Sequence, residues 1–453
     1  MPPYGSLSVA DAQKAMMKNV DKYEIKIGEA RAQHAQIIAF PEDGLYGFLL
    51  DRESSLPYLE NIPTDDVIKK QNINPCEQSA FNDRPILQRM SCLAKQHDIA
   101  IVFNMGDVQP CHPLVDINCR ITADERKQYN TDVAIDSDGR LLAKYHKRHL
   151  YFEKAFDVPD SVNYATFTTS FGVYFGMFTC FDILFKQPAI ELVKNYSVAN
   201  IVFPTAWINQ FPHLAATEVQ QAWSRVMSVN VLAANNHLPL LGFTGSGIYS
   251  AGHALKSFAS YAENIDTLLV ARVPINPDDV NSVPSDGYNV YDGYHPDAVL
   301  GPLPTNQPRY VFHPLIGKDG RALACTKEFC CETKYSRLSD NEFYAFGVFI
   351  GIDKSKPNDY LMHACMLTKC ANGSLSSCGE PVYEASTAFS FVEIVSDHDD
   401  ATVFPMIVTG NRNLLPPSDF AFNNPYNLTS RFQPGKNPVL MAVTLYGRIF
   451  VSS

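Results

Sequence analysis

The sequence of 453 residues lacks long apolar segments and clusters of basic residues, and each absence excludes a class of protein. No stretch approaches the roughly 18 to 20 uninterrupted apolar residues needed to span a bilayer, so we expect no membrane span. Lysine and arginine number 37 against 48 aspartates and glutamates, a formal net charge of −11, and they form no basic block. This argues against nucleic acid or an anionic membrane surface as a partner.

The two ends of the chain also lack recognisable targeting features. Met1 to Gly5 has neither the basic region nor the apolar region of a secretory signal peptide. Tyr446 to Ser453 has no hydrophobic tail for a lipid anchor. Because the cysteines favour an oxidising compartment, we expect a secreted, extracellular protein from which a leader has been removed.

Cysteine is present in an odd number, eleven, and ten of the cysteines lie in clusters. Even-numbered clusters suggest a disulfide framework. The alternative is a metal site that includes His363 beside Cys365 and Cys370. No CxxC pair occurs with a matching CxxC or HxxxH partner, so we favour disulfides and expect no metal. The clustered cysteines are Cys76, Cys92, Cys111, Cys119, Cys325, Cys330, Cys331, Cys365, Cys370 and Cys378.

Short loops suggest two of the pairings, Cys76 with Cys92 and Cys111 with Cys119, and leave the others open. Three Asn-x-Ser/Thr triplets also fit an extracellular glycoprotein. Their asparagines are Asn195, Asn372 and Asn427.

The remaining cysteine, Cys180, stands apart from the clusters. It follows the apolar run 171–177, and a helical pattern begins at Pro188. A thiol at a sharp turn from a buried strand to a helix lies near main-chain N–H groups that favour a thiolate. A lone cysteine is often only a small buried hydrophobic residue, so its interpretation depends on other residues.

Up to residue 275, helical patterns alternate with short apolar runs, which indicates an α/β domain. Residues 276–308 are rich in Pro, Asp, Asn and Gly, which indicates a linker or long loop. Residues 309–453 read mainly as strands, so we expect a smaller β-rich domain that holds the C-terminal cysteines. Expected helices include 8–33, 85–97, 188–196 and 213–234, and expected strands include 35–40, 99–103, 141–147, 199–204, 343–352, 388–395, 401–408 and 439–451.

Three chemically useful residues are expected at strand ends in the α/β domain: Glu42, Lys147 and Cys180. Strand ends in α/β sheets converge where ligands bind. The thiolate would attack an amide carbon, and the carboxylate would accept the thiol proton and later activate water. The ammonium and the Phe181 N–H would hold the developing oxyanion. Spacing alone is weak evidence, because single glutamates and lysines at strand ends are mostly solvated.

The segments around these residues resemble those of a known family. Phe40-Pro-Glu-Asp-Gly-Leu-Tyr-Gly47, Lys144-Tyr-His-Lys-Arg-His-Leu-Tyr151 and Phe178-Thr-Cys-Phe-Asp-Ile-Leu-Phe185 are similar to the three signature segments of the nitrilase superfamily. Phe203-Pro-Thr-Ala-Trp207 and Thr244-Gly-Ser-Gly-Ile-Tyr249 resemble its vanin/biotinidase branch more narrowly. The resemblance covers nearly the whole chain. It implies an α-β-β-α sandwich followed by a smaller, disulfide-rich β domain.

The resemblance also implies roles. Glu42 would be the general base, Lys147 the oxyanion-stabilising cation and Cys180 the nucleophile. Glu153 would be a supporting glutamate, although it could equally be a surface charge. His146, next to Lys147, could suggest a Cys–His catalytic pair like that of papain-like proteases. We exclude it from the site, because strand alternation sends His146 and Lys147 to opposite faces.

The family hydrolyses amides through a thioester, without a metal or organic cofactor. Vanins split pantetheine into pantothenate and cysteamine, and biotinidases release biotin from biocytin. Residues 212–214 resemble vanins, whereas residues 232–235 resemble biotinidases. We favour pantetheine as the substrate and keep biocytin as the alternative. A non-enzymatic binding protein on this fold is a third hypothesis. Trp207 and His213 are candidate substrate-binding residues, although large aromatic residues more often lie in a core.

Two further expectations come from the resemblance. This branch tends to be monomeric, so we expect a monomer. Its members open with a buried strand ahead of the first helix, which this chain lacks, so we expect the sequence to be truncated at its start.

Overall fold

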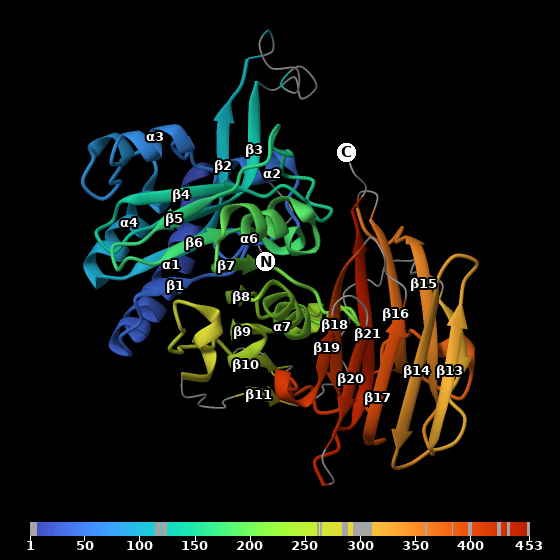
Figure 1. Ribbon diagram of the computed structural model, residues 1–453. Coiled ribbons are helices and arrows are strands. Elements are labelled where there is room, and N and C mark those ends of the chain that lie inside the picture. Colours follow the sequence, from blue (N-terminus) through green and yellow to red (C-terminus); the bar gives the residue numbers. More distant parts are fainter. Residues whose placement is uncertain are drawn as a thin grey trace. The chain divides into compact units, whose positions relative to one another are not determined.

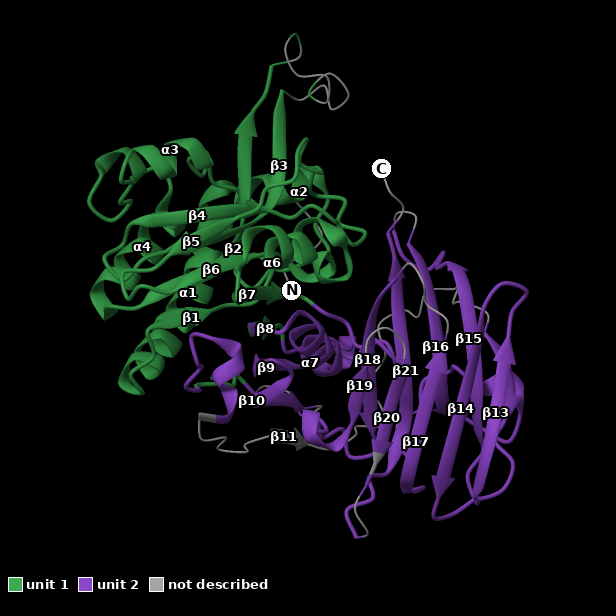
Figure 2. Ribbon diagram, in the orientation of Figure 1, with its two compact units in different colours: residues 1–206, 231–236, 266–270 green, residues 207–230, 237–265, 271–453 purple. Residues whose placement is uncertain are grey.

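The computed structural model describes residues 7–450 apart from 113, 115–118, 120–124, 261, 263–264, 283–288, 293–309, 358–359, 383, 397–400, 424–426 and 433–434. The chain divides into two compact units that interleave along the sequence (Figure 2). Unit 1 comprises residues 1–206, 231–236 and 266–270, and unit 2 comprises 207–230, 237–265 and 271–453. Much of the predicted linker, 276–308, lies outside the described residues.

Two amphipathic helices of unit 1, α1 (Val9–Ala32) and α4 (Pro85–His97), contact each other and share one hydrophobic core with the strands beside them (Figure 1). The side chain of Ser8 caps α1 by accepting a hydrogen bond from the Asp11 N–H. The buried residues of α1 recur every three or four positions, which places them on one face. They are Ala12, Met16, Val20, Tyr23, Ile27 and Ala30.

The first sheet of unit 1 has the order β1-β2-β3-β4, from β1 (Ile37–Ala39), β2 (Ala100–Pro110), β3 (Arg126–Ile135) and β4 (Leu141–His146). β1 runs parallel to β2, and the remaining pairs are antiparallel. The register places Asn104 of β2 opposite Asp132 of β3. β3 is buried along nearly its whole length, so its polar side chains must find partners inside the protein.

Further strands of unit 1 are neighbours in the order β7-β6-β5, from β5 (Thr166–Thr168), β6 (Tyr174–Met177) and β7 (Asn200–Thr205). β6 runs parallel to β7, and the chain passes from β6 into the segment that carries Cys180. Short helices α2 (Arg52–Ser55), α3 (Asp65–Lys70) and α6 (Glu191–Tyr196) complete the described helices of this unit that have names in Figure 1.

The predicted helix over 213–234 is wrong in its second half. α7 spans Ala216–Met227 and ends at Ser228, which adopts a left-handed conformation with φ of 53°. The chain then forms strand β8 (Asn230–Asn235). The left-handed residue ends the helix, and the following Val229 and Val231 are β-branched residues that favour a strand.

In unit 2, α7 contacts an antiparallel hairpin of β9 (Ser246–Ser250) and β10 (His253–Ser260), and β11 (Asn289–Asp292) pairs in parallel with β10. The C-terminal part of unit 2 consists of two five-stranded sheets, as the β-rich prediction required. One has the order β12-β15-β16-β21-β18 and the other β13-β14-β17-β20-β19.

The strands of the first of these sheets are β12 (Val311–Pro314), β15 (Tyr344–Ile352), β16 (Leu361–Lys369), β18 (Ala401–Thr409) and β21 (Leu440–Ile449). Those of the second are β13 (Asp319–Cys325), β14 (Cys330–Arg337), β17 (Phe389–Ser396), β19 (Ala421–Asn423) and β20 (Asn427–Arg431). Buried residues from both sheets form one hydrophobic core.

Disulfides join ten of the eleven cysteines, all of which are described. Cys365 and Cys370, the candidate ligands beside His363, both belong to disulfides. Cys331–Cys365 links β14 to β16 and therefore joins the two C-terminal sheets. The pairs are Cys76–Cys92, Cys111–Cys119, Cys325–Cys330, Cys331–Cys365 and Cys370–Cys378, and Cys180 retains a thiol.

Three observations bear on the remaining expectations. Asn195 and Asn372 are exposed, whereas Asn427 is half-buried at the start of β20, and glycosylation of all three stays a prediction. Within the described part of the chain, every helix is too short or too polar to cross a membrane. Among the same residues, His, Cys, Asp and Glu do not gather in groups of three or more that could hold a metal ion.

Candidate active site

Glu42 lies in the turn after β1 and is almost completely buried, with 1% of its surface exposed. The backbone around it is fixed by two side-chain amides. Asn236 donates to the Glu42 carbonyl oxygen at 2.6 Å, and the Asp43 N–H donates to Oδ1 of Asn104 at 3.0 Å. Asp43 itself is left-handed, with φ of 57°. The turn therefore aims the Glu42 side chain inward at a fixed point.

Cys180 lies at a second turn, where the chain leaves β6. It is the first residue of a short 3-10 helix, Cys180–Leu184. Its φ of 48° is unusual for a residue other than glycine and marks a sharp turn. The Thr179 N–H donates to Oδ2 of Asp182 at 3.4 Å, and the Asp182 N–H donates to the Thr179 carbonyl at 3.1 Å. These bonds hold the strained residue between them.

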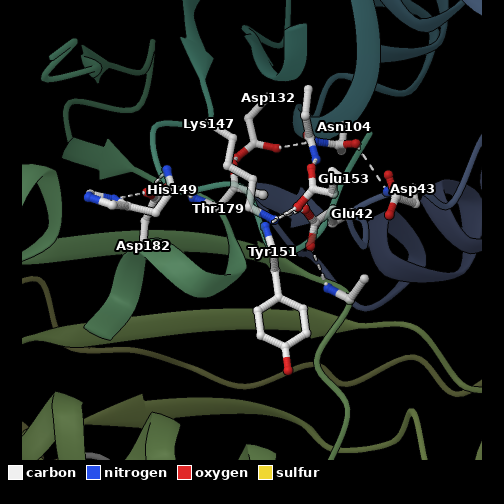
Figure 3. A network of polar contacts seen from close by, with 12 residues as sticks. Glu42, Asp43, Asn104, Asp132, Lys147, His149, Tyr151, Glu153, Thr179 and Asp182 are labelled. Carbon is white, nitrogen blue, oxygen red and sulfur yellow. Dashed lines mark hydrogen bonds and ion pairs between the residues drawn. The ribbon is translucent and has the colours of Figure 1, made fainter. Parts of the chain in front are cut away.

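Lys147 directly follows β4, and its side chain is buried. Its Nζ donates to Oε1 of Glu42 at 2.7 Å and to Oε1 of Glu153 (Figure 3). Burial alone disfavours the ammonium, but the carboxylates of Glu153 and Glu42 raise the pKa of Lys147 well above its usual value. Lys147 therefore stays charged throughout the physiological pH range.

The two oxygens of Glu42 have different partners. Oε1 accepts hydrogen bonds from Lys147 and from Nδ2 of Asn130, the latter at 2.8 Å. Among the described residues, Oε2 accepts one bond, from the Ala206 N–H at 2.8 Å. Oε1 is therefore held by two donors, and Oε2 retains capacity to accept a proton.

Glu153 belongs to the same group and is not a surface charge. Oε1 accepts from Lys147 and from the Tyr151 N–H, the latter at 3.1 Å, and Oε2 accepts from Asn130 at 2.9 Å. Burial raises the pKa of Glu153, although the ammonium of Lys147 opposes the rise. The structure thus brings Glu153 together with Glu42 around one cation.

The environment of Cys180 favours the neutral thiol at rest. Burial and the negative charge of Glu42 raise its pKa well above the usual value. The ammonium of Lys147, the Thr205 hydroxyl and the Ala206 N–H act in the opposite direction but do not outweigh burial. A thiol in this state needs a base when it attacks, and Glu42 is the carboxylate whose charge it senses.

Asp182 connects the turn of Cys180 to the segment of Lys147. Its carboxylate accepts hydrogen bonds from the Tyr145 hydroxyl and from the His149 N–H, at 2.7 and 2.9 Å. His146 points elsewhere, because its Nε2 lies 2.8 Å from Oδ2 of Asp107. The Asp182 carboxylate therefore ties the turn of Cys180 to the segment around Lys147, whereas the contact of His146 with Asp107 gives no support to a Cys–His pair.

The remaining predicted site residues are less informative. Phe181 is buried and packs edge-on against Tyr151, with ring centroids 5.1 Å apart. Trp207 and His213 belong to unit 2. Nε1 of Trp207 donates to the Leu214 carbonyl, and burial lowers the pKa of His213 to about 3. Substrate binding by Trp207 and His213 stays a prediction.

Sequence reasoning missed three polar residues that the structure places behind the carboxylates: Asn104, Asn130 and Asp132. All three are at most 1% exposed. Asn130 contacts Glu42 and Glu153, and it also contacts Asn104. Asn104 in turn contacts Asp132 (Figure 3). The available signal was the pair Asn130 and Asp132, two positions apart and therefore on one face of β3, just before its apolar end at residues 133–135.

A buried thiol, an ammonium and two carboxylates come together in this α/β unit, a set of groups suited to the hydrolysis of carbon–nitrogen bonds. Comparison with known families agrees. Residues 9–268 match the carbon-nitrogen hydrolase family, and residues 303–453 match the vanin C-terminal domain. The chain therefore belongs to the carbon–nitrogen hydrolase family, and it is an amide-hydrolysing enzyme.

Its relatives carry two names. The chain is 38% identical to pantetheinase from Sus scrofa, a match that covers 99% of this chain and 86% of that protein. It is 36% identical to human biotinidase, over 99% of this chain and 86% of that protein. The predicted nitrilase-like fold with a disulfide-rich β domain is thereby confirmed, as is the vanin/biotinidase branch.

Proposed function

We propose that this enzyme hydrolyses the amide of pantetheine to pantothenate and cysteamine, through a thioester on Cys180. The distribution of hydrogen bonds on Glu42 is the observation that carries the proposal. Oε1 is occupied by two donors, whereas Oε2 can accept the thiol proton. The substrate follows from similarity to pantetheinases over nearly the whole chain.

In the first half-reaction, the sulfur of Cys180 attacks the amide carbonyl carbon while its proton passes to Glu42. The carbonyl electrons move to oxygen. Lys147 has three N–H groups, of which two bond carboxylates within the described structure, so the third can hold the oxyanion. The main-chain N–H of Phe181 is the second proposed donor.

Collapse of this intermediate breaks the C–N bond. The amine leaves with the proton that Glu42 had accepted, and the acyl group remains on the sulfur. In the second half-reaction, Glu42 takes a proton from water, and the resulting hydroxide attacks the thioester carbon. The C–S bond then breaks, the acid leaves, and the thiol of Cys180 regains its proton.

The test is release of cysteamine from pantetheine, measured by mass spectrometry, for the wild-type protein and for Cys180→Ala. We expect release by the wild type and none by the variant. Undiminished release by Cys180→Ala would exclude Cys180 as the nucleophile.

Biocytin is the second candidate substrate, because human biotinidase is nearly as similar to this chain as the pantetheinases are. Turnover of the two amides by the same preparation separates the candidates. If neither amide nor any other in a panel with cysteamine, lysine and ammonia leaving groups acylates Cys180, both candidate substrates and the thioester on Cys180 are wrong.

We also propose that the protein is secreted and acts as a monomer, with residues 1–275 as the catalytic domain and 309–453 as a separate β domain. Five disulfides support an oxidising compartment. The family matches to 9–268 and 303–453 support this division. Gel filtration with light scattering tests the oligomeric state.

A further inference from the structure

The backbone N–H of Asp43 fixes the orientation of the side-chain amide of Asn104. The Asp43 N–H can only donate, and it bonds the side-chain oxygen of Asn104 at 3.0 Å. Nδ2 of Asn104 must therefore face the other way. There it donates to Oδ1 of Asn130 at 2.6 Å and to Oδ1 of Asp132 at 2.8 Å.

The orientation of Asn104 in turn fixes that of Asn130. Because Oδ1 of Asn130 accepts from Asn104, its Nδ2 faces the two carboxylates. Nδ2 donates to Oε1 of Glu42 at 2.8 Å and to Oε2 of Glu153 at 2.9 Å. Each carboxylate thus receives one bond from Asn130 and one from Lys147.

The same relay reaches the turn of the thiol. Asp132 lies opposite Asn104 in the sheet, and its Oδ2 accepts from the Thr179 hydroxyl at 2.6 Å. Thr179 immediately precedes Cys180. A continuous path of hydrogen bonds therefore links the turn of Glu42 to the turn of Cys180 through Asn104 and Asp132 (Figure 3).

Holding the carboxylates of Glu42 and Glu153 this close together costs free energy, so the arrangement calls for a functional explanation. The buried carboxylate of Glu42 and the partly buried carboxylate of Glu153 share one ammonium and repel each other, and neither would gain stability from being held together. We propose that Asn130 is a positioning residue for amide hydrolysis, which keeps Glu42 and Glu153 in fixed places around Lys147, and that Asn104 locks the orientation of its amide. The proposal rests on the function proposed above.

The chemical consequence concerns the charged state of the carboxylates. Two N–H donors from one neutral amide favour charged carboxylates without adding a second cation. Burial raises the pKa of Glu153, and the bonds from Lys147 and Asn130 oppose that rise. Loss of the Asn130 amide therefore lets Glu153 take up a proton at higher pH, which weakens its hold on Lys147 beside the proposed base.

The variant Asn130→Ala tests this with pantetheine as the substrate. We expect kcat to fall roughly 10- to 100-fold, the effect of losing hydrogen bonds to a charged group. KM should change by less than about twofold, because the Asn130 side chain is buried and its Nδ2 is bonded to the two carboxylates. The acid limb of the kcat/KM profile should move to higher pH. An unchanged kcat and an unmoved limb would overturn the proposal.

Asn74→Ala is the matched control. Asn74 is another buried asparagine of unit 1, and it bonds the Asp138 carbonyl and the Ser91 hydroxyl, away from the carboxylates. It should lower stability and leave kcat and the acid limb unchanged. An equal loss of kcat in Asn74→Ala would show that Asn130→Ala acts only through stability, against the proposal.

Asn104→Ala provides a second test should Asn130→Ala fail to fold. It frees the Asn130 amide to rotate, so we expect the same direction of pH shift with a smaller loss of kcat. An unmoved acid limb in a folded Asn104→Ala protein would contradict the proposed lock. Wild-type protein that releases no cysteamine would instead count against the proposed function, whereas an active wild type with a normal Asn130→Ala variant would count only against this inference.

Discussion

The Nζ atom of Lys147 lies 2.7 Å from Oε1 of Glu42, and each side chain is 1% exposed. These residues are 105 positions apart in the sequence and come from turns after different strands. A buried ion pair of this kind contributes little net stability, because desolvation offsets attraction. Its better explanation is chemical, since the pair places a charged carboxylate and an ammonium beside the thiol of Cys180.

Replacement of the ammonium should abolish most of the activity. In Lys147→Met, the oxyanion loses its cationic donor, so we expect kcat/KM to fall roughly 100- to 1,000-fold or more. Lys144→Met is the control, because Lys144 forms a comparable buried pair with Asp107 at 2.7 Å. The control should lose about 3 to 5 kcal/mol of stability and keep its kcat. Equal kcat losses in the two variants would contradict a catalytic role for Lys147.

Replacement of the base should prevent acylation. Glu42→Gln keeps the size of the side chain but cannot accept the thiol proton, so kcat/KM should fall roughly 100- to 10,000-fold. Glu60→Gln is the matched control, since Glu60 is a buried carboxyl that instead accepts the N–H groups of Ile86 and Leu87 at the start of α4. Stopped-flow measurement of the acylation rate distinguishes Glu42→Gln from Glu60→Gln. Rapid acylation of Glu42→Gln would exclude Glu42 as the base.

Asp132 should make stability fall with rising pH. Burial raises its pKa to about 8 in the folded protein, above the usual value near 3.8. The folded state therefore holds the proton more tightly, and the stability linked to it is lost between about pH 4 and pH 8. Asp132→Asn lacks this pH-dependent loss of stability, whereas other titrating groups, such as Glu60, contribute equally to the stability of both proteins.

Urea unfolding with the disulfides intact measures the effect at pH 5, 6, 7, 8 and 9. The stability of the wild type minus that of Asp132→Asn should decrease from pH 5 to pH 8 and then level off, by an amount on the order of a few kcal/mol. A difference that stays constant with pH would show that Asp132 titrates normally.

Alkylation should modify one position in the native protein. Because the other ten cysteines form disulfides, iodoacetamide without a reductant should add one group per chain, at Cys180. The raised pKa of the thiol predicts a slow reaction at neutral pH that accelerates as the pH rises. Peptide mapping checks the position. More than one modified cysteine would contradict the disulfide framework.

Glu42, Lys147 and Cys180 could be proposed from the sequence because each lies in a short segment that resembles the family and follows an expected strand. Glu153 lies just after the second of these segments, and the structure places its carboxylate on Lys147. Asn104, Asn130 and Asp132 were missed for a physical reason. Their function depends on register across β2 and β3, and a single sequence does not specify which residues stand opposite each other.

The error in the predicted helix over 213–234 has a local cause. The apolar residues after Met227 continue to suit a helix face, so periodicity gave no sign of an end. The end depends on the left-handed conformation of Ser228, and serine adopts that conformation too rarely for sequence alone to reveal it. The left-handed conformations of the turn residues Asp43 and Cys180 could likewise not be predicted from the sequence.

The most direct test of the account is the mass of the protein quenched in acid a few milliseconds after it is mixed with pantetheine. We predict an added pantothenoyl group on the peptide that contains Cys180, and no such adduct in Cys180→Ala. A pantothenoyl group found on a different residue, or pantetheine cleavage with no acylated protein at any time, would contradict a thioester on Cys180.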